Sequence, residues 1–234
     1  MSRRILSANL MAALLLVTAG VVHASDVASP DGISDRIKAC AACHGERGRT
    51  EAEVYYPSIA GKPAGYLYAQ LLNFRDGRRS NAAMQAMLGV LSDDYLRAMA
   101  AYYAAQEPVL SAPDTNFATA AKRETGRKLV LDGDPKRDIP RCSACHGEAL
   151  TGAAPAVPGL LGLRPEYLSA QIGAWRVGVR HAAAPDCMAT IAQRLSQDEI
   201  DAVTAWIASQ PYPRDHQPPP PLTAKLPLRC GSVP

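Results

Sequence analysis

The strongest constraint in this sequence is a short motif, Cys-x-x-Cys-His, that occurs twice. The two copies are Cys40, Cys43 and His44, and, 102 positions later, Cys142, Cys145 and His146. Thiols three positions apart lie on one face of a helical turn, where both can form thioether bonds with the two vinyl groups of one porphyrin. The adjacent histidine can then bind the iron. Each copy therefore predicts a site of covalent haem attachment.

A bare Cys-x-x-Cys also occurs in redox dithiols and in halves of zinc sites. Neither chemistry requires a histidine directly after the second cysteine, and chance is a poor explanation for two copies that both have one. We therefore expect two covalently bound haem c groups. Aromatic residues make up only 6% of the chain, so buried porphyrins would supply apolar surface that each core otherwise lacks.

The two halves of the chain also align outside these motifs, at offsets of 101 to 104 positions. Each motif is followed by a Pro-x-x-x-Gly segment, then by Tyr-Leu-x-Ala-Gln, and last by a methionine seven residues before a Leu-Ser pair. This is duplication at the scale of a domain. We expect a first domain at residues 25–112, a second at 113–210 and a proline-rich tail at 211–234.

Helical periodicity and capping residues predict an all-α fold of two tandem domains. No strand pattern of comparable length is present, and the segments that contain the methionines read as loops. The expected helices span residues 33–43, 64–74 and 92–106 in the first half, and residues 119–131, 165–176 and 196–209 in the second.

A methionine is the best candidate for the second axial ligand at each iron, because a haem with histidine on one side needs a distal ligand to transfer electrons. Met188 is the only methionine in the second half. In the first half Met84 keeps register with Met188 relative to the Leu-Ser pairs. Met87 competes with Met84, whereas Met99 lies in an expected helix and is interpreted as core packing.

The segment after each motif offers a partner for the histidine. Pro57 lies 13 residues after His44, and Pro158 lies 12 after His146. A backbone carbonyl at these prolines can accept the Nδ1 proton of the ligating histidine and fix its orientation. A plain turn is equally compatible with this spacing.

Several other residues recur at matched positions. Aromatic pairs, which we expect to wall the porphyrins, are Tyr66 with Tyr167 and Phe74 with Trp175. Basic pairs are Arg75 with Arg176 and Arg79 with Arg180. They could meet haem carboxylates or the other domain, but we interpret them as solvated helix ends and do not count them as site residues. His181 is interpreted as a loop residue or one near the haem carboxylates, because its counterpart, Ser80, cannot bind iron. His216 is interpreted as a solvent-exposed or packing residue of the tail.

Two cysteines are left over, Cys187 and Cys230, and neither has a counterpart in the first half. In an exported protein such a pair favours a disulfide, which would tie the tail to the Met188 segment. Alternatively, Cys187 could bind the second iron as a thiolate, which would favour an enzyme.

The N-terminus has the three regions of a secretory signal peptide: arginines, an apolar run and a small-residue site near Ala24. We therefore expect residues 1–24 to be removed and the mature chain to be periplasmic, with no transmembrane span. Loss of Arg3 and Arg4 lowers the formal charge from +3 to +1. That balance gives no support to a nucleic-acid partner.

Taken together, the paired haem motifs, the Pro-x-x-x-Gly loops and the methionines before Leu-Ser resemble the di-haem cytochrome c4 family, from about Ile33 to Gln210. The resemblance implies two class I cytochrome c domains about a pseudo-twofold axis. It also implies low-spin His/Met haems that carry electrons in the periplasm from a respiratory donor towards a terminal oxidase or another acceptor. Cys187, Cys230 and the long tail depart from that pattern and leave the partner open.

The residues themselves favour an electron carrier, since we find no acid-base pair or nucleophile suited to a substrate. Two alternatives remain. One is a di-haem enzyme, of the thiosulfate dehydrogenase or peroxidase type, which would need an unusual or vacant ligand at one iron. The other is the cytochrome subunit of a dehydrogenase or oxidase complex, which could associate peripherally with a membrane complex.

Overall fold

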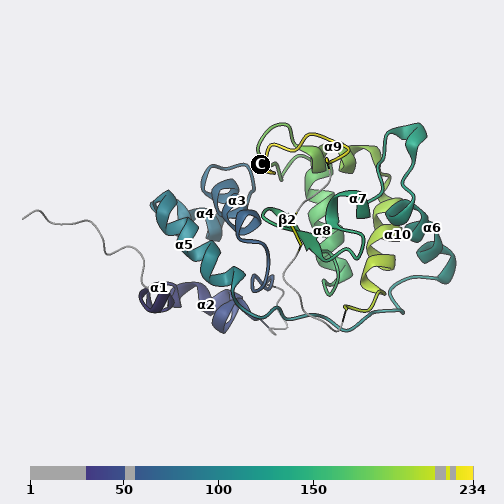
Figure 1. Cartoon of the computed structure of the whole chain (residues 1–234). Coiled ribbons are helices and arrows are strands. Elements are labelled where there is room, and N and C mark those ends of the chain that lie inside the picture. Colours follow the sequence, from purple (N-terminus) through teal and green to yellow (C-terminus); the bar gives the residue numbers. More distant parts are fainter. Residues whose placement is uncertain (1–29, 51–55, 214–219, 222–224, 234) are drawn as a thin grey trace, which may run out of the picture.

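A computed structural model describes residues 30–50, 56–213, 220–221 and 225–233. The expected signal peptide and His216 lie outside this part of the chain. The described elements are mostly helical and form two tandem cytochrome-like units, which confirms the predicted fold class. Figure 1 shows the two units side by side, joined by an extended linker between α5 and α6.

The first unit contains five helices within the described residues: α1 (Pro30–Arg36), α2 (Lys38–His44), α3 (Ala64–Arg75), α4 (Ala82–Leu88) and α5 (Asp93–Ala104), with a 3-10 turn at Glu46–Gly48. The second contains α6 (Ala120–Leu131), α7 (Ser143–His146), α8 (Pro165–Arg176), α9 (Cys187–Arg194) and α10 (Gln197–Ala208), with a 3-10 turn at Pro135–Arg137. Two short antiparallel strands, β1 (Gly152–Ala153) and β2 (Val157–Pro158), follow α7.

Capping residues begin the longer helices where the sequence predicts. Ser92, Thr119 and Ser196 each accept a hydrogen bond from a backbone N–H in the first turn of α5, α6 and α10. At α10 the side chain of Glu199 also accepts from the Ser196 backbone N–H, which completes a capping box. These bonds satisfy donors that a helix start otherwise leaves unpaired.

Two expectations about local structure are wrong. The segment 33–43 is not one helix, because the backbone leaves helical geometry at Ile37, between α1 and α2. The methionine segments are not loops either, since Met84 lies in α4 and Met188 in α9. Asn81 and Asp186 cap these two short helices by accepting backbone hydrogen bonds, and such caps help to stabilise a helix too short to form alone.

Each unit has its own hydrophobic core. In the first, α3 packs against α5, and Leu96 is 0% exposed. In the second, α10 packs against α6 and α8, and Ile200, the counterpart of Leu96, is likewise 0% exposed. Gly126 permits the close crossing of α6 and α10, since a Cβ there would collide with the backbone of Ala202. Two separate cores are the physical basis of two domains.

The domains meet along a seam with approximate twofold symmetry. Arg79 and Arg180 form an antiparallel bridge, and backbone N–H groups of Ser80 and His181 donate to the carbonyls of Val179 and Arg78, at 3.2 and 2.6 Å. The paired segments occupy equivalent positions in the two halves. Within the described residues, no helix is long and apolar enough to cross a bilayer.

Candidate haem sites

The second domain contains a large cavity that brings its predicted site residues together. Cys142, Cys145, His146 and Met188 all line it. The remaining walls are mainly apolar, and they include Leu160, Leu168, Ile172, Ile191, Leu195, Val203 and Ile207. A cavity with thiols and an imidazole at one element and a thioether at another has the donor set of a c-type haem site.

The histidine of each motif is oriented by a backbone carbonyl. His44 Nδ1 lies 2.9 Å from the carbonyl oxygen of Pro57, and His146 Nδ1 lies 2.8 Å from that of Pro158. A carbonyl oxygen can only accept, so each Nδ1 carries the proton and each Nε2 keeps its lone pair free for a metal. The structure thus has the hydrogen bonds predicted between the motif histidines and the carbonyl groups of Pro57 and Pro158.

Burial favours the neutral imidazole in both domains. It lowers the pKa of His44 and of His146 below the usual histidine value. It also raises the pKa of the Cys142 thiol to about 12, and that of Cys40 above its usual value. Catalytic dithiols depend on a thiol with a lowered pKa, so these cysteines are poorly suited to the redox-dithiol alternative.

In the first domain, Cys40 and Met84 both pack against the same core cluster, which contains Leu67, Leu96 and Met99. Met99 is 3% exposed, in agreement with its predicted packing role. Met87, the competing ligand candidate, is 49% exposed, whereas Met84 is partly buried. Burial therefore favours Met84 over Met87 as the thioether that faces the first site.

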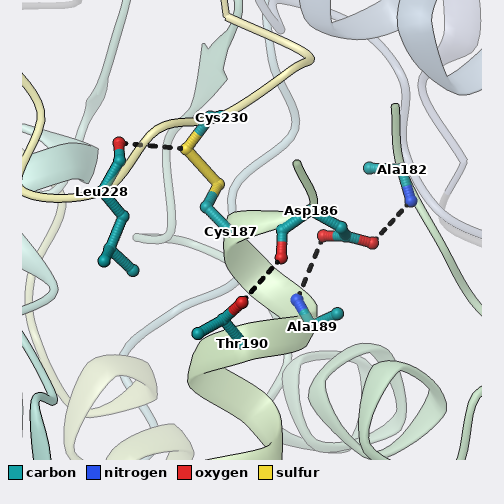
Figure 2. Close-up of a disulfide and its surroundings, with 7 residues drawn as sticks. All are labelled: Ala182, Asp186, Cys187, Ala189, Thr190, Leu228 and Cys230. Atoms are coloured by element: carbon teal, nitrogen blue, oxygen red, sulfur yellow. Dashed lines mark hydrogen bonds between the residues drawn. A yellow bond between two sulfur atoms is a disulfide. The ribbon is translucent and has the colours of Figure 1, made fainter. Parts of the chain in front are cut away.

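Cys187 and Cys230 form a disulfide, as the leftover pair predicts. Figure 2 shows this bond at the start of α9, where the carboxylate of Asp186 accepts hydrogen bonds from the backbone N–H groups of Ala189 and Ala182, at 3.0 and 2.7 Å. The helix start that presents Met188 is thus fixed by a cap and by a covalent bond. Since the sulfur of Cys187 is in this bond, it is not a thiolate available to iron.

Arg79 and Arg180 contact the other domain at the seam, so their interpretation as solvated helix ends is wrong and the alternative of contact with the other domain is correct. Arg180 is only 3% exposed and lines the second cavity. Arg79 donates to the side-chain carbonyls of Gln70 and Gln171 at 3.1 and 2.6 Å, and Arg180 donates to the same two oxygens at 2.9 and 2.6 Å. Each arginine also stacks on an aromatic ring of its own domain.

Further polar groups cluster around these arginines. Lys62, Tyr66, Tyr167 and Trp175 line the second cavity together with Arg180. Burial alone would raise the pKa of Tyr66, but Arg180, Arg79 and Lys62 lower it overall. Burial lowers the pKa of Lys62. The seam therefore concentrates positive charge, and within the described residues no carboxylate forms an ion pair with Arg79 or Arg180.

These features match the shape and charge of haem. The apolar part of the cavity suits the porphyrin ring, and the cationic seam suits its carboxylates. The indole Nε1 of Trp175 and the hydroxyl of Ser232 are buried without a hydrogen-bond partner among the described residues, and both residues line the cavity. Such orphaned donors are rare in folded proteins unless another group accepts from them.

Comparison with known proteins agrees with this geometry. The family model described as "Cytochrome c" matches residues 124–211, and that described as "Cytochrome C oxidase, cbb3-type, subunit III" matches residues 31–102. A cytochrome c4 from Pseudomonas aeruginosa is 32% identical over 85% of this chain and 98% of its own length. This chain belongs to the di-haem cytochrome c4 family.

Other members of the family are also similar. A thiosulfate dehydrogenase electron acceptor from Stutzerimonas stutzeri (strain A1501) is 38% identical over 86% of this chain and 93% of its own length. The crystal structure of reduced cytochrome c4 from Pseudomonas stutzeri superposes with a TM-score of 0.66 at 28% identity, and covers 77% of this chain and 98% of that one. Membership of the cytochrome c4 family makes electron transfer through c-type haem the general function.

Sequence reasoning missed part of the site of this cytochrome c4 relative. It did not identify the seam residues Arg79, Arg180, Gln70 and Gln171 as functional. A signal was present, because both pairs recur at an offset of 101. Lys62 gave no such signal, because the equivalent position in the second half is not basic. The tail residues that line the second cavity gave none either, because the first half has no equivalent tail.

Proposed function

We propose that this chain is a periplasmic di-haem carrier of single electrons and that it accepts them from a thiosulfate dehydrogenase. The observation that carries the proposal is the second cavity, whose walls hold two thiols, an oriented imidazole and a thioether. The identity of the donor rests on the relative from Stutzerimonas stutzeri that is named for accepting electrons from that enzyme.

We assign the haem-binding residues by domain. The first haem would be held by Cys40, Cys43, His44 and Met84, and the second by Cys142, Cys145, His146 and Met188. When bound, each haem supplies a one-electron redox centre. Residues 25–112 and 113–210 would be the two carrier domains, after export and removal of residues 1–24.

The polypeptide controls the iron through its axial ligands. Because Pro57 and Pro158 hold the Nδ1 protons, the imidazoles of His44 and His146 can present only Nε2 to the metal. A hydrogen bond from Nδ1 also increases the basicity of the ligand. The thioethers of Met84 and Met188 would serve as the second ligands. A thioether favours the ferrous state, and with both ligands in place neither iron would offer an open position to a substrate.

The basic residues at the seam would bind the haem carboxylates, because Arg180 is buried in the cavity wall and no carboxylate among the described residues forms an ion pair with it. Arg180 and the indole N–H of Trp175 would donate to these carboxylates from the second domain. Tyr66 and Lys62 approach the same cavity from the first domain. Because both domains contribute, the two haems would be held in one arrangement through which an electron can pass from one to the other.

The oxidation of thiosulfate by such a dehydrogenase releases a number of electrons that matches two haems. Oxidative coupling of two thiosulfate ions forms one sulfur–sulfur bond and releases two electrons, one for each haem. From this carrier the electrons would pass to a terminal oxidase or another redox protein. The disulfide removes Cys187 as a thiolate ligand, so the enzyme alternative loses the feature that favoured it.

Stopped-flow absorbance can test this function. The oxidised holoprotein is mixed with a thiosulfate dehydrogenase and thiosulfate, and haem reduction is followed. We expect both haems to be reduced, and no reduction when the dehydrogenase is omitted. Reduction by thiosulfate without the dehydrogenase would establish the enzyme alternative, and no reduction in its presence would exclude this donor.

A further inference from the structure

The second haem cavity has a wall that comes from the end of the chain, which we name the C-terminal strap (residues 225–233). Its residues alternate, as in an extended segment with one inner face and one outer face. The partly buried residues Leu226, Leu228 and Cys230 line the cavity, and the residues between them, Lys225, Pro227 and Arg229, are exposed.

The strap is fastened to the start of α9, and the described residues just before it are bonded beside β1. The Cys187–Cys230 disulfide joins it to the first residue of α9, and the Gly231 backbone N–H donates to the Pro185 carbonyl at 2.9 Å. Just before the strap, the Pro220 carbonyl accepts from the Ala154 backbone N–H at 2.8 Å. Figure 1 shows this last part of the chain returning to α9. The strap is therefore held as a permanent cover.

The first site is more open in the described part of the chain. Cys43 is exposed and His44 is half-buried, whereas Cys145 is half-buried and His146 is only 8% exposed. No described segment of the first domain occupies a position equivalent to that of the strap. Within the described residues, the two sites thus have the same donor types but differ in how far their cysteine and histidine are covered.

An apolar surface follows the first methionine. Met87 is 49% exposed on α4, and Val90, just after α4, is 91% exposed. Their counterparts in the second domain are covered or polar. Ile191 lines the second cavity, and the guanidinium of Arg194 donates to the Asp138 carbonyl. Exposed apolar side chains close in sequence to a site residue, as these two are to Met84, are candidates for a protein interaction surface.

We propose that redox proteins dock on the first domain, on the surface formed by Met87 and Val90, and that the strap keeps the second haem from exchanging electrons directly with them. This inference rests on the proposed role as a di-haem carrier. The partner's cofactor loses one electron, the first haem gains it, and the second haem is reduced only through the first.

The partner we expect is a redox protein with an apolar surface around its own cofactor. Met87 and Val90 have no charge, and the mature chain has 23 basic and 22 acidic residues, so net charge contributes little to steering. A small apolar contact also suits an electron carrier, because transient redox complexes bury little area and dissociate quickly.

Electron-transfer kinetics of the full-length holoprotein test the docking surface. Val90→Asp should lower the second-order rate constant for reduction by a thiosulfate dehydrogenase about tenfold, since a charge in an apolar contact must be desolvated. The matched control is Val177→Asp, because Val177 is 72% exposed in the second domain, and it should leave the rate within about twofold. The opposite ranking of the two variants would overturn the proposal.

A second set of variants tests the strap. Cys187→Ser, Cys230→Ser and Leu228→Asp together detach it from the cavity. In the Val90→Asp background, this change should restore much of the lost rate by opening the second haem. An unchanged rate in the detached form would show that the strap is not the barrier.

The rate of imidazole binding to each haem tests the role of the strap without any electron donor. In the oxidised wild-type chain, imidazole should bind the first haem about tenfold faster than the second, as resolved by NMR, and strap detachment should reduce this difference. If the dehydrogenase reduces no form of the protein, the proposed donor is wrong, and the imidazole rates still decide the role of the strap. Equal rates at the two wild-type haems would overturn it.

Discussion

Replacing Cys187 and Cys230 together by serine should lower the free energy of unfolding of the second domain by about 4 kcal/mol. The disulfide spans 43 sequence positions, and the chain-entropy model gives about 4 kcal/mol for a loop of this length at 25 °C. That corresponds to roughly a thousandfold change in the equilibrium between the folded and unfolded domain. Both cysteines are replaced so that no free thiol remains beside Met188.

Guanidinium chloride unfolding of the ferric holoprotein measures this loss. The near-infrared Met–iron band reports the distal ligand, and haem-resolved NMR signals separate the two domains. The first domain is an internal control in the same sample, because neither cysteine lies in it. We expect its transition midpoint to stay unchanged while that of the second domain moves to lower denaturant concentration.

Two results would refute the reasoning. A loss below about 1 kcal/mol in the second domain would mean that the bond hardly restricts the unfolded chain. Equal losses in the two domains would mean that the disulfide stabilises the seam and not the segment that presents Met188. Peptide mapping without reductant provides the prior check, since it must recover the Cys187 and Cys230 peptides linked to each other.

Three further predictions concern the haems. Cys40→Ala should lower the amount of haem that survives acid extraction, and mass spectrometry of the matured protein would show whether any first-domain haem stays covalently bound. Met84→Ala and Met188→Ala should each remove the Met–iron band of one haem and lower its reduction potential, whereas the same loss in Met87→Ala would contradict the assignment. Arg180→Gln should lower the potential of the second haem by on the order of 50 mV, since removal of a nearby positive charge favours the ferric state; spectroelectrochemistry measures the shift, and no change would exclude an electrostatic role.

The sequence predicts the parts of this fold that local interactions determine. Helix α8 begins at Pro165 and ends at Arg176 as expected, because a proline in the first turn and a regular apolar pattern both mark it. The starts of α5, α6 and α10 follow from their capping side chains. For the motif histidines, the similar spacing in the two halves pointed to Pro57 and Pro158 as candidate partners but could not separate that role from a plain turn, and the hydrogen bonds decide it.

Features that depend on tertiary contacts were missed. Helices α4 and α9 are too short to show a clear period, and α9 begins at a disulfide-bonded cysteine whose partner is 43 positions away. The burial of Arg180 is also a long-range effect. Nothing within its own segment distinguishes it from Arg176, which is exposed, and the difference arises only when the other domain supplies Gln70.

The seam shows why haem binding and domain docking should be treated as one process. Arg79 and Arg180 are held between the domains by two neutral side-chain carbonyls, and in the described part of the chain neither forms an ion pair with a carboxylate. Arg180 is buried, and a buried charge without a counter-charge costs several kcal/mol, so this side chain calls for a negative partner that the described residues do not supply. Haem brings its own carboxylates, which can neutralise these arginines from both sites. The same residues would therefore bind the cofactors and join the domains, which explains why Gln70 with Gln171 and Arg79 with Arg180 recur at one offset although none of them is suited to bind iron.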